Sequence, residues 1–190
     1  MESKNIMIVG VGGQGTLLAS KLLGRILLEN GYDVKVSEVH GMSQRGGSVV
    51  TYVRCGDKVY SPIIDKGEAD IIVSFELLEA ARWAEYLKEG GILLTNTQKI
   101  NPMPVITGAA DYPKALEQKL TALPIRLDAM DALGLALQAG SAKAVNLVLL
   151  GRLSRYFHFT DEQWQDAIEK SVPAKFLELN KKAFALGKEA

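Results

Sequence analysis

The stretch Ile6-Met7-Ile8-Val9-Gly10-Val11-Gly12-Gly13-Gln14-Gly15-Thr16 decides the fold of this chain. Its leading apolar residues are stopped by glycines, and the residues that follow carry Leu18, Leu22 and Ile26 at four-residue spacing. An apolar run, a glycine-rich break and a helical repeat predict a strand, a tight turn and a helix.

Apolar and helical runs alternate beyond this unit. We expect strands at residues 34–36, 49–54, 58–61, 71–75, 92–95 and 125–129, and helices at residues 76–88 and 113–120. The turn Cys55-Gly56-Asp57 suits a hairpin between residues 49–54 and 58–61. Gly90-Gly91 suits the end of the helix expected at residues 76–88. The pattern predicts an α/β fold, with a Rossmann-like, mostly parallel sheet and an inserted β-hairpin.

The chain from Met130 onward has a wholly helical pattern, which predicts a helical C-terminal region. Thr160-Asp161-Glu162-Gln163 has the spacing of a capping box, with Phe159 and Trp164 placed as its hydrophobic staple. The last helix carries one apolar stripe, made of Phe176, Leu179, Ala183 and Leu186. We expect this stripe to pack on the sheet of this chain or on a partner subunit, and an ordinary intrachain core is the simpler of the two.

The composition fits one domain of 190 residues, in which residues 1–129 form the sheet core and 130–190 the helical part. Lys plus Arg and Asp plus Glu number 22 each, so no excess charge favours nucleic acid or an anionic membrane as a partner. No stretch approaches the roughly 20 apolar residues of a membrane span. The N-terminal residues do not resemble a secretory signal, so we expect a cytoplasmic protein.

One cysteine, Cys55, and two histidines, His40 and His158, limit the metal chemistry of the chain. They exclude an internal disulfide, a four-cysteine zinc site and an iron–sulfur cluster held by this chain alone. We therefore expect no metal site and interpret Cys55 and His158 as structural.

The glycine turn is the first candidate site. Its G-x-G-x-x-G spacing between a strand and a helix exposes N–H groups at the positive end of the helix dipole, which suits a phosphate, a diphosphate or a carboxylate. The candidate ligand-binding residues are Gly10, Gly12, Gly13, Gln14, Gly15 and Thr16. The alternative is a tight turn that needs glycine only for its own geometry.

Two related nucleotide sites fit less well. The spacing from Gly10 to Thr16 resembles a Walker A loop, but no lysine precedes Thr16, which argues against NTP hydrolysis. Glu38 stands 23 residues beyond Gly15 and is a candidate for binding the ribose of a dinucleotide. It serves equally well as a solvated acid at the edge of a loop.

The segment 39–48 is the second candidate site, because it should lie at the carboxyl edge of the sheet beside the glycine turn. Its polar and glycine residues are candidates for binding an anion, and they are Ser43, Gln44, Arg45, Gly46 and Gly47. His40 and Arg45 are the candidates for direct chemistry, with a structural histidine and an ion pair inside the loop as the alternatives. No G-x-S-x-G motif surrounds Ser43, so hydrolase chemistry lacks support.

With these motifs in place, the chain resembles the gamma-type domain of the 2-oxoacid:ferredoxin oxidoreductases. The matching segments cover nearly the whole chain, and they are G-V-G-G-Q-G at 10–15, G-M-S-Q-R-G-G-S at 41–48, N-L-V-L-L-G at 146–151 and V-P-A-K-F-L-E-L-N-K-K-A-F-A-L-G at 172–187. Pyruvate-type and oxoglutarate-type members usually carry Glu shortly before the Arg-Gly step. Gln44-Arg45-Gly46-Gly47 therefore points to the small (beta) subunit of the indolepyruvate-type members.

The resemblance implies a function that the composition does not show. It implies coenzyme A-dependent oxidative decarboxylation of an aryl 2-oxoacid, which gives an acyl-CoA, carbon dioxide and reduced ferredoxin. Thiamine diphosphate and the [4Fe-4S] clusters would belong to a larger alpha subunit, and this chain alone would hold no cofactor. The glycine turn and the Arg45 loop would then bind coenzyme A phosphates or the substrate carboxylate.

Two other classes of protein stay open on the sequence. One is a free-standing NAD(P)- or flavin-binding oxidoreductase that uses the glycine turn and Glu38. The other is a non-enzymatic module that binds a nucleotide and regulates a partner.

Overall fold

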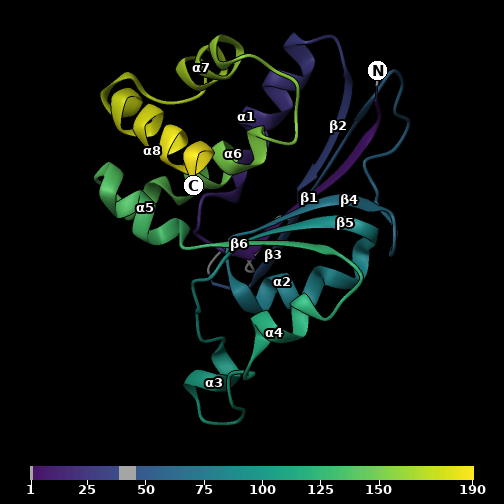
Figure 1. Cartoon of the computed structure of the whole chain (residues 1–190), viewed down its shortest axis with the longest axis vertical. Helices are drawn as coiled ribbons and strands as arrows, with labels where there is room; N and C mark the ends of the chain where they lie inside the picture. Colours follow the sequence, from purple (N-terminus) through teal and green to yellow (C-terminus); the bar gives the residue numbers. More distant parts are fainter. Residues whose placement is uncertain (1, 39–45) are drawn as a thin grey trace.

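The glycine turn joins strand β1 (Lys4–Val11) to helix α1 (Thr16–Glu29) in the computed structural model, which describes residues 2–38 and 46–190 (Figure 1). The other strands are β2 (Asp33–Glu38), β3 (Ser48–Gly56), β4 (Ala69–Ser74), β5 (Leu87–Asn96) and β6 (Arg126–Met130). The other helices are α2 (Leu77–Trp83), α3 (Met103–Ile106), α4 (Leu116–Thr121), α5 (Ala132–Ala139), α6 (Val145–Ser154), α7 (Asp161–Glu169) and α8 (Leu177–Glu189). Short 3₁₀ turns span Ala84–Tyr86, Ala142–Ala144 and Ala174–Phe176.

The six strands form one sheet in the order β2-β3-β1-β4-β5-β6. Strands β1, β4, β5 and β6 pair in parallel, whereas β3 pairs antiparallel with both β1 and β2. Because β2 opposes β3 and β3 opposes β1, β2 runs in the same direction as β1. The α/β class and the mostly parallel sheet are confirmed, and the inserted antiparallel hairpin consists of β2 and β3.

The prediction that residues 58–61 form the second strand of the hairpin is wrong. Residues 58–61 form no strand, because β1 and β2 already occupy both edges of β3. Side chains hold the segment instead. The carboxylate of Asp33 accepts a hydrogen bond from the N–H of Val59 at 2.8 Å, and Arg54 Nη1 donates to the carbonyl of Ile63 at 2.8 Å.

The predicted helix at residues 76–88 is also shorter than expected. Helix α2 ends at Trp83, a 3₁₀ turn follows, and Gly90-Gly91 lies inside β5 rather than at the end of a helix. The pairing of β4 with β5 shifts register here, and Gly90 has φ +72°. A Cβ at Gly91 would lie 2.9 Å from the carbonyl oxygen of Lys88. The two glycines therefore serve an irregular strand, a role that glycine also has in bulges.

Helices cover both faces of the sheet (Figure 1). On one face, α1, α5, α6, α7 and α8 share a continuous apolar core with the strands, and on the other face α2 and α4 close a smaller one. The predicted capping box at Thr160 and Gln163 is present, and the rings of Phe159 and Trp164 lie 6.0 Å apart as its staple. No helix in the described part of the chain has the length and apolar character of a membrane span.

The packing of α8 matches its predicted stripe only in part. Ala183 is fully buried, but the fully buried ring is that of Phe184, while Phe176 is 46% exposed. Phe176 precedes the helix, and the ammonium group of Lys175 lies over its ring at 4.6 Å from the centroid. The close contact between α6 and α8 depends on glycine, since a Cβ at Gly187 would lie 1.9 Å from the carbonyl oxygen of Val148.

Candidate functional site

The glycine turn has a backbone that other residues reach only with strain. Gly13 has φ +97° and Gly15 has φ +90°. Such left-handed conformations cost other L-residues roughly 1–2 kcal/mol each. A Cβ at Gly10 would lie 2.9 Å from Gln14 Oε1 and 3.0 Å from the Cβ of Phe75. The turn therefore needs glycine for its own geometry, whether or not it also binds a ligand.

The same turn leaves donors available at the start of α1. The N–H of Gly12 donates to the carbonyl of Gly47 at 2.9 Å and is therefore occupied. Within residues 2–38 and 46–190, no acceptor meets the N–H groups of Gly13, Gly15, Thr16 and Leu17. The first turn of α1 has no acidic residue and no side-chain cap. These donors, at the positive end of a 14-residue helix, have the geometry that binds anions.

Gln14 braces the turn with both ends of its side-chain amide. Its Oε1 accepts from the N–H of Val11 at 2.8 Å, and its Nε2 donates to the carbonyl of Phe75 at 3.0 Å. The side chain thus ties the end of β1 to the end of β4. The backbone N–H of Gln14 is also occupied, since it donates to the carbonyl of Val11 at 3.2 Å.

The second candidate segment meets the turn where the sequence predicted. Ser48 pairs with Val11 in the register of β1 and β3, and the carbonyl of Gly47 holds the N–H of Gly12. Gly46 has φ +99°, so its backbone also requires glycine. The remaining candidates of this segment lie outside the described residues, and they are His40, Ser43, Gln44 and Arg45. Their roles stay predictions.

Glu79, on α2, holds the first residue of β3. Its Oε2 accepts from the hydroxyl of Ser48 and from Trp83 Nε1 at 3.3 Å, and its Oε1 accepts from Arg82 Nε at 3.2 Å. The carboxylate is buried, so these donors replace the water that it loses. The sequence analysis did not select Glu79. Its one signal was an acid inside the apolar run 77–81.

The ends of β4 and β5 supply a polar frame beside the turn. Glu76 Oε1 accepts from the hydroxyl of Tyr112 at 2.6 Å and from the N–H of Ile100 at 3.0 Å. Burial, together with the hydrogen bond to Glu76, raises the pKa of Tyr112, so that the phenol stays a donor at neutral pH. Asn96 Nδ2 donates to the carbonyl of Phe75 at 3.1 Å, which joins the frame to the brace formed by Gln14.

A cavity of about 500 Å³ opens at the glycine turn. It is lined by Gly13, Gln14, Gly15, Gln98, Ile100, Leu133, Ala142, Lys143 and Val145. Lys143 makes no ion pair with any residue that the structure describes, so its positive charge stays available beside the free N–H groups. The apolar side chains line the rest of the cavity. The sequence analysis missed Lys143 and Gln98, which lie far along the chain from the turn.

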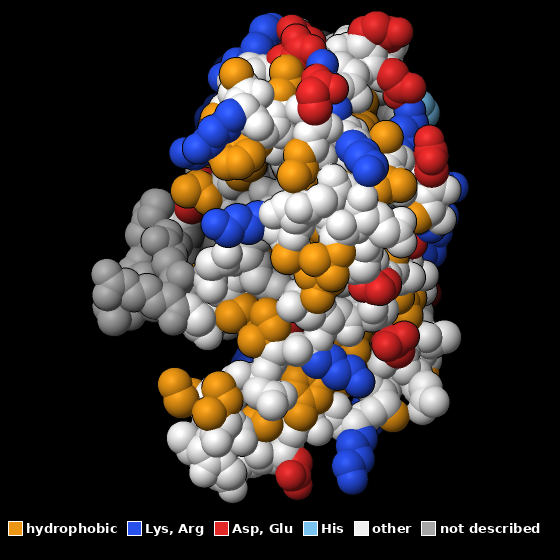
Figure 2. Space-filling view, turned by 90° about the vertical axis from the view of Figure 1, so that its left-hand side faces the viewer, with side chains coloured by type: hydrophobic (Ala, Val, Ile, Leu, Met, Phe, Trp, Pro, Cys, Tyr) orange, Lys and Arg blue, Asp and Glu red, His pale blue; other side chains and the backbone are white. Residues whose placement is uncertain are grey.

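The face around this cavity is rich in apolar side chains. Figure 2 looks from the side of α3 and α5 and shows hydrophobic side chains in groups from the upper to the lower part of this face, with charged ones among them that are most numerous near the top. Met103 and Ile106, on α3, are 68% and 65% exposed, and Leu137, on α5, is 59% exposed. Helices α3 and α5 follow the carboxyl ends of β5 and β6, so this apolar face borders the candidate site.

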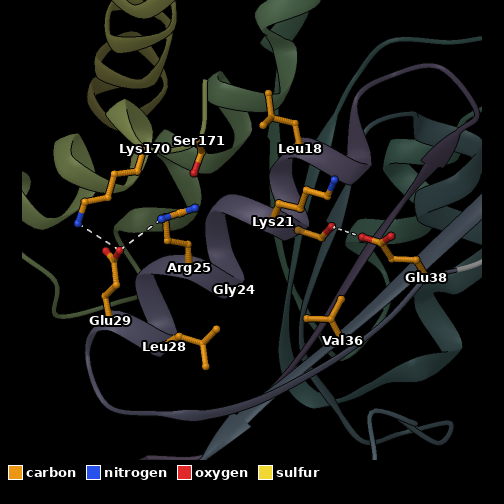
Figure 3. Close-up of a pocket in the computed structure, with 11 residues that line it drawn as sticks. Leu18, Lys21, Gly24, Arg25, Leu28, Glu29, Val36, Glu38, Lys170 and Ser171 are labelled. Atoms are coloured by element: carbon orange, nitrogen blue, oxygen red, sulfur yellow. Dashed lines mark hydrogen bonds and ion pairs between the residues drawn. The ribbon is translucent and has the colours of Figure 1, made fainter. Parts of the chain in front are cut away.

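Glu38 does not reach the glycine turn in the way a dinucleotide site requires. Strand β3 lies between β1 and β2. The end of β2 is therefore one strand spacing, about 4.8 Å, further from the glycine turn than it would be in a strand next to β1. The carboxylate of Glu38 accepts a hydrogen bond from the hydroxyl of Ser20 at 2.9 Å (Figure 3). The separation removes the geometric support for Glu38 as a ribose ligand.

Glu38 lines a different and larger cavity, of about 800 Å³, along the outer face of α1 (Figure 3). Two of its cations are paired within the chain, because Glu29 lies 3.6 Å from Arg25 and 3.2 Å from Lys170. Leu28 and Val36 expose apolar side chains at its edge. The cavity at the glycine turn is smaller but has uncompensated donors, and it is therefore the candidate site.

Comparison with known proteins agrees with the fold. The family described as pyruvate ferredoxin/flavodoxin oxidoreductase matches residues 5–190. Indolepyruvate oxidoreductase subunit IorB from Thermococcus kodakarensis is 46% identical, over 100% of this chain and 96% of its own length.

Two solved structures share the fold. The pyruvate oxidoreductase subunit PORC from Thermotoga maritima has a TM-score of 0.76 at 26% identity and covers 100% of this chain and 97% of its own. The 2-oxoglutarate:ferredoxin oxidoreductase from Magnetococcus marinus, with 2-oxoglutarate, coenzyme A and succinyl-CoA bound, has a TM-score of 0.76 at 17% identity. The match covers 100% of this chain but only 31% of that longer one. The resemblance drawn from the motifs is confirmed: the chain belongs to the pyruvate ferredoxin/flavodoxin oxidoreductase family.

Proposed function

We propose that this chain is the small subunit of a cytoplasmic indolepyruvate-type oxidoreductase and works with a larger subunit. The observation that carries the proposal is the 46% identity to an indolepyruvate oxidoreductase subunit over the whole chain. The identity to a pyruvate oxidoreductase subunit is 26%. An aryl 2-oxoacid is therefore favoured over pyruvate as the substrate of the complex.

The reaction takes a 2-oxoacid, coenzyme A and two oxidised ferredoxins to an acyl-CoA, carbon dioxide, a proton and two reduced ferredoxins. Thiamine diphosphate and [4Fe-4S] clusters, bound to the larger subunit, would supply decarboxylation and electron transfer. This chain cannot supply the four thiolates of a cluster, because its single cysteine is Cys55. Burial also raises the pKa of the Cys55 thiol, which disfavours the thiolate that a metal needs.

The part of this chain in the reaction is to bind an anionic group, either a phosphate of coenzyme A or the carboxylate of the oxoacid. The free N–H groups of Gly13, Gly15 and Thr16 offer fixed donors, and Lys143 adds a charge beside the same cavity. We assign Arg45 to the same anion, since the described end of its segment is bonded to the turn at Gly12. His40 is the candidate for proton transfer.

The apolar face beside the cavity supports a larger partner. Met103 and Ile106 on α3 and Leu137 on α5 expose most of their side chains, and a protein partner would cover them. A partner on this face would close one side of the cleft and exclude water from the anion site. The single domain of residues 1–190 would then form one wall of an active site that the two subunits share.

The test uses the complex purified anaerobically from its native host, with Arg45→Ala and Lys143→Ala in this subunit. We expect the apparent KM for coenzyme A or for the oxoacid to rise about tenfold, the effect of losing one charged hydrogen bond. The reactant whose constant rises identifies the bound anion. Lys119→Ala is the control, because it removes an exposed lysine of α4. If neither constant changes in either variant, the anion-binding role is wrong.

The other two classes of protein make different predictions. A free-standing NAD(P) or flavin enzyme would be purified alone with bound nucleotide, and the position of β3 between the turn and Glu38 argues against it. A regulatory module would bind coenzyme A and give no turnover even in the complex.

A further inference from the structure

A third cavity, lined mainly by charged side chains, lies at the opposite edge of the sheet from β2. It measures about 470 Å³ and is lined by Arg126, Leu127, Asp128, Arg152, Arg155 and Tyr156. We call it the arginine cavity. These residues come from β6 and from the end of α6, and β4 and β5 separate β6 from the glycine turn. Three strand spacings, about 14 Å, therefore lie between the strands that carry the two sites.

One ion pair forms the base of the arginine cavity. Arg152 holds Asp128 through three hydrogen bonds, from Nε to Oδ2 at 2.8 Å, from Nη2 to Oδ1 at 2.9 Å and from Nε to Oδ1 at 3.1 Å. The hydroxyl of Tyr156 donates to the same Oδ2 at 2.6 Å. Burial opposes ionisation of Asp128, but these hydrogen bonds outweigh it and hold its pKa below the usual value. Asp128 is thus a charged, fully occupied acceptor that orients Arg152.

The ion pair leaves positive charge and a donor without a partner. Arg126 and Arg155 are exposed, and neither makes an ion pair within the part of the chain that the structure describes. Three guanidinium groups face one carboxylate, so two positive charges are uncompensated. In addition, Arg152 Nη1 is buried and lacks a hydrogen-bond partner among the described residues. A buried donor without an acceptor is destabilising by roughly 1–3 kcal/mol, and more when it is charged.

We propose that the arginine cavity binds a phosphate group. A phosphate monoester or inorganic phosphate carries about −1.5 to −2 charge at pH 7, which matches the two uncompensated arginines. Its several oxygens can accept from guanidinium groups that approach from β6 and from α6 at the same time. A carboxylate carries half of that charge, and Asp128 already occupies the planar fork of Arg152.

Compensation of the α6 dipole explains only part of this arrangement. Arg152 lies in the last turn of α6 and Arg155 at its C-cap, where cations are favourable. That role does not involve Arg126, which belongs to β6. It also leaves the buried Arg152 Nη1 without an acceptor among the described residues.

Calorimetric titration of the full chain with inorganic phosphate and with diphosphate, in chloride buffer, tests the proposal. The variant is Arg126→Ala/Arg155→Ala, which leaves the buried pair intact. We expect about tenfold weaker binding for each arginine, or about 100-fold for the double variant. The control is Lys119→Ala/Lys182→Ala, which removes the same charge from exposed positions elsewhere.

Two further arms separate this site from the glycine turn and identify the source of the phosphate. Arg45→Ala must leave phosphate binding at the arginine cavity unchanged, because the two sites are independent. Tighter binding of adenosine diphosphate than of diphosphate would assign the phosphate to a nucleotide, and the reverse would assign it to the free ion. Absence of binding at millimolar phosphate, or equal binding by both double variants, overturns the proposal.

Discussion

Replacement of Gln14 by alanine removes the brace between the two strands that end at the candidate site. The substitution deletes the acceptor of the Val11 N–H at 2.8 Å and the donor to the Phe75 carbonyl at 3.0 Å. The two backbone groups are affected differently. Phe75 keeps Asn96 Nδ2 as a donor at 3.1 Å, so its carbonyl stays satisfied.

The N–H of Val11 has no such replacement. Gly12 bonds to Gly47 across the antiparallel pair of β1 and β3, and neighbouring residues of such a pair alternate in direction. The N–H of Val11 therefore points away from β3, toward Gln14. Leaving it unsatisfied costs about 1–2 kcal/mol, and the lost bond to Phe75 adds about 0.5–1 kcal/mol. The sum, about 1.5–3 kcal/mol, lowers the Tm of a domain of this size by roughly 3–12 °C.

Differential scanning calorimetry of the purified chain measures this change directly. Gln138→Ala is the matched control, because Gln138 is exposed on α5, and its Tm should stay within about 1–2 °C of the natural chain. In the complex, Gln14→Ala should also raise the KM of the reactant whose constant Arg45→Ala raises. A Gln14→Ala variant as stable as the control would refute the brace, and the account of the turn with it.

Three other measurements test the packing and the charges. Gly187→Ala should cost about 3 kcal/mol in urea denaturation, because its Cβ would lie 1.9 Å from the carbonyl oxygen of Val148; an unchanged midpoint would contradict the close helix contact. Tyr156→Phe removes a hydrogen-bond donor to Asp128. The pKa of Asp128 is lowered in the folded chain, so the ionised carboxylate stabilises the fold above about pH 4, and this stabilisation is lost as the pH falls through the folded-state pKa. The free energy of unfolding of the variant should thus be lower than that of the natural chain at pH 7, and the difference should be smaller at pH 3. Equal differences at the two pH values would contradict this role of Tyr156. The Cys55 thiol, buried with a raised pKa, should react with a thiol reagent only when the chain unfolds, and rapid reaction of the native protein would contradict its burial.

The sequence predicted those parts of the fold that depend on local pattern. The run at Ile6–Val9, the glycines and the helical repeat formed the expected strand, turn and helix. The antiparallel pairing was predicted with the wrong partner, because residues 49–54 pair with β1 and β2, which no local turn signal reveals. Gly90-Gly91 was misinterpreted because a glycine pair marks both a helix end and an irregular strand.

The candidate site shows the same division. That the described end of the segment 39–48 lies beside the glycine turn was predictable, since the segment follows β2, which runs in the same direction as β1. The bond from Gly12 to Gly47 depends on the antiparallel pairing of β3 with β1, which the sequence did not predict. Glu79, Asn96 and Lys143 were missed, because each comes from a distant element and acts through contacts that only the folded chain creates. A polar residue directly after a buried strand, as at Asn96, was the one signal that could have identified part of this frame.

The most direct test of the central claim is the activity of the complex that forms around this chain. The tagged protein would be purified anaerobically from its native host and assayed for reduction of ferredoxin with indolepyruvate, pyruvate or 2-oxoglutarate, with and without coenzyme A. We predict a stoichiometric larger subunit that contains thiamine diphosphate and iron–sulfur clusters, and coenzyme A-dependent reduction that is fastest with indolepyruvate. A chain that is purified alone with bound nicotinamide or flavin, or a complex that prefers pyruvate, would contradict the account.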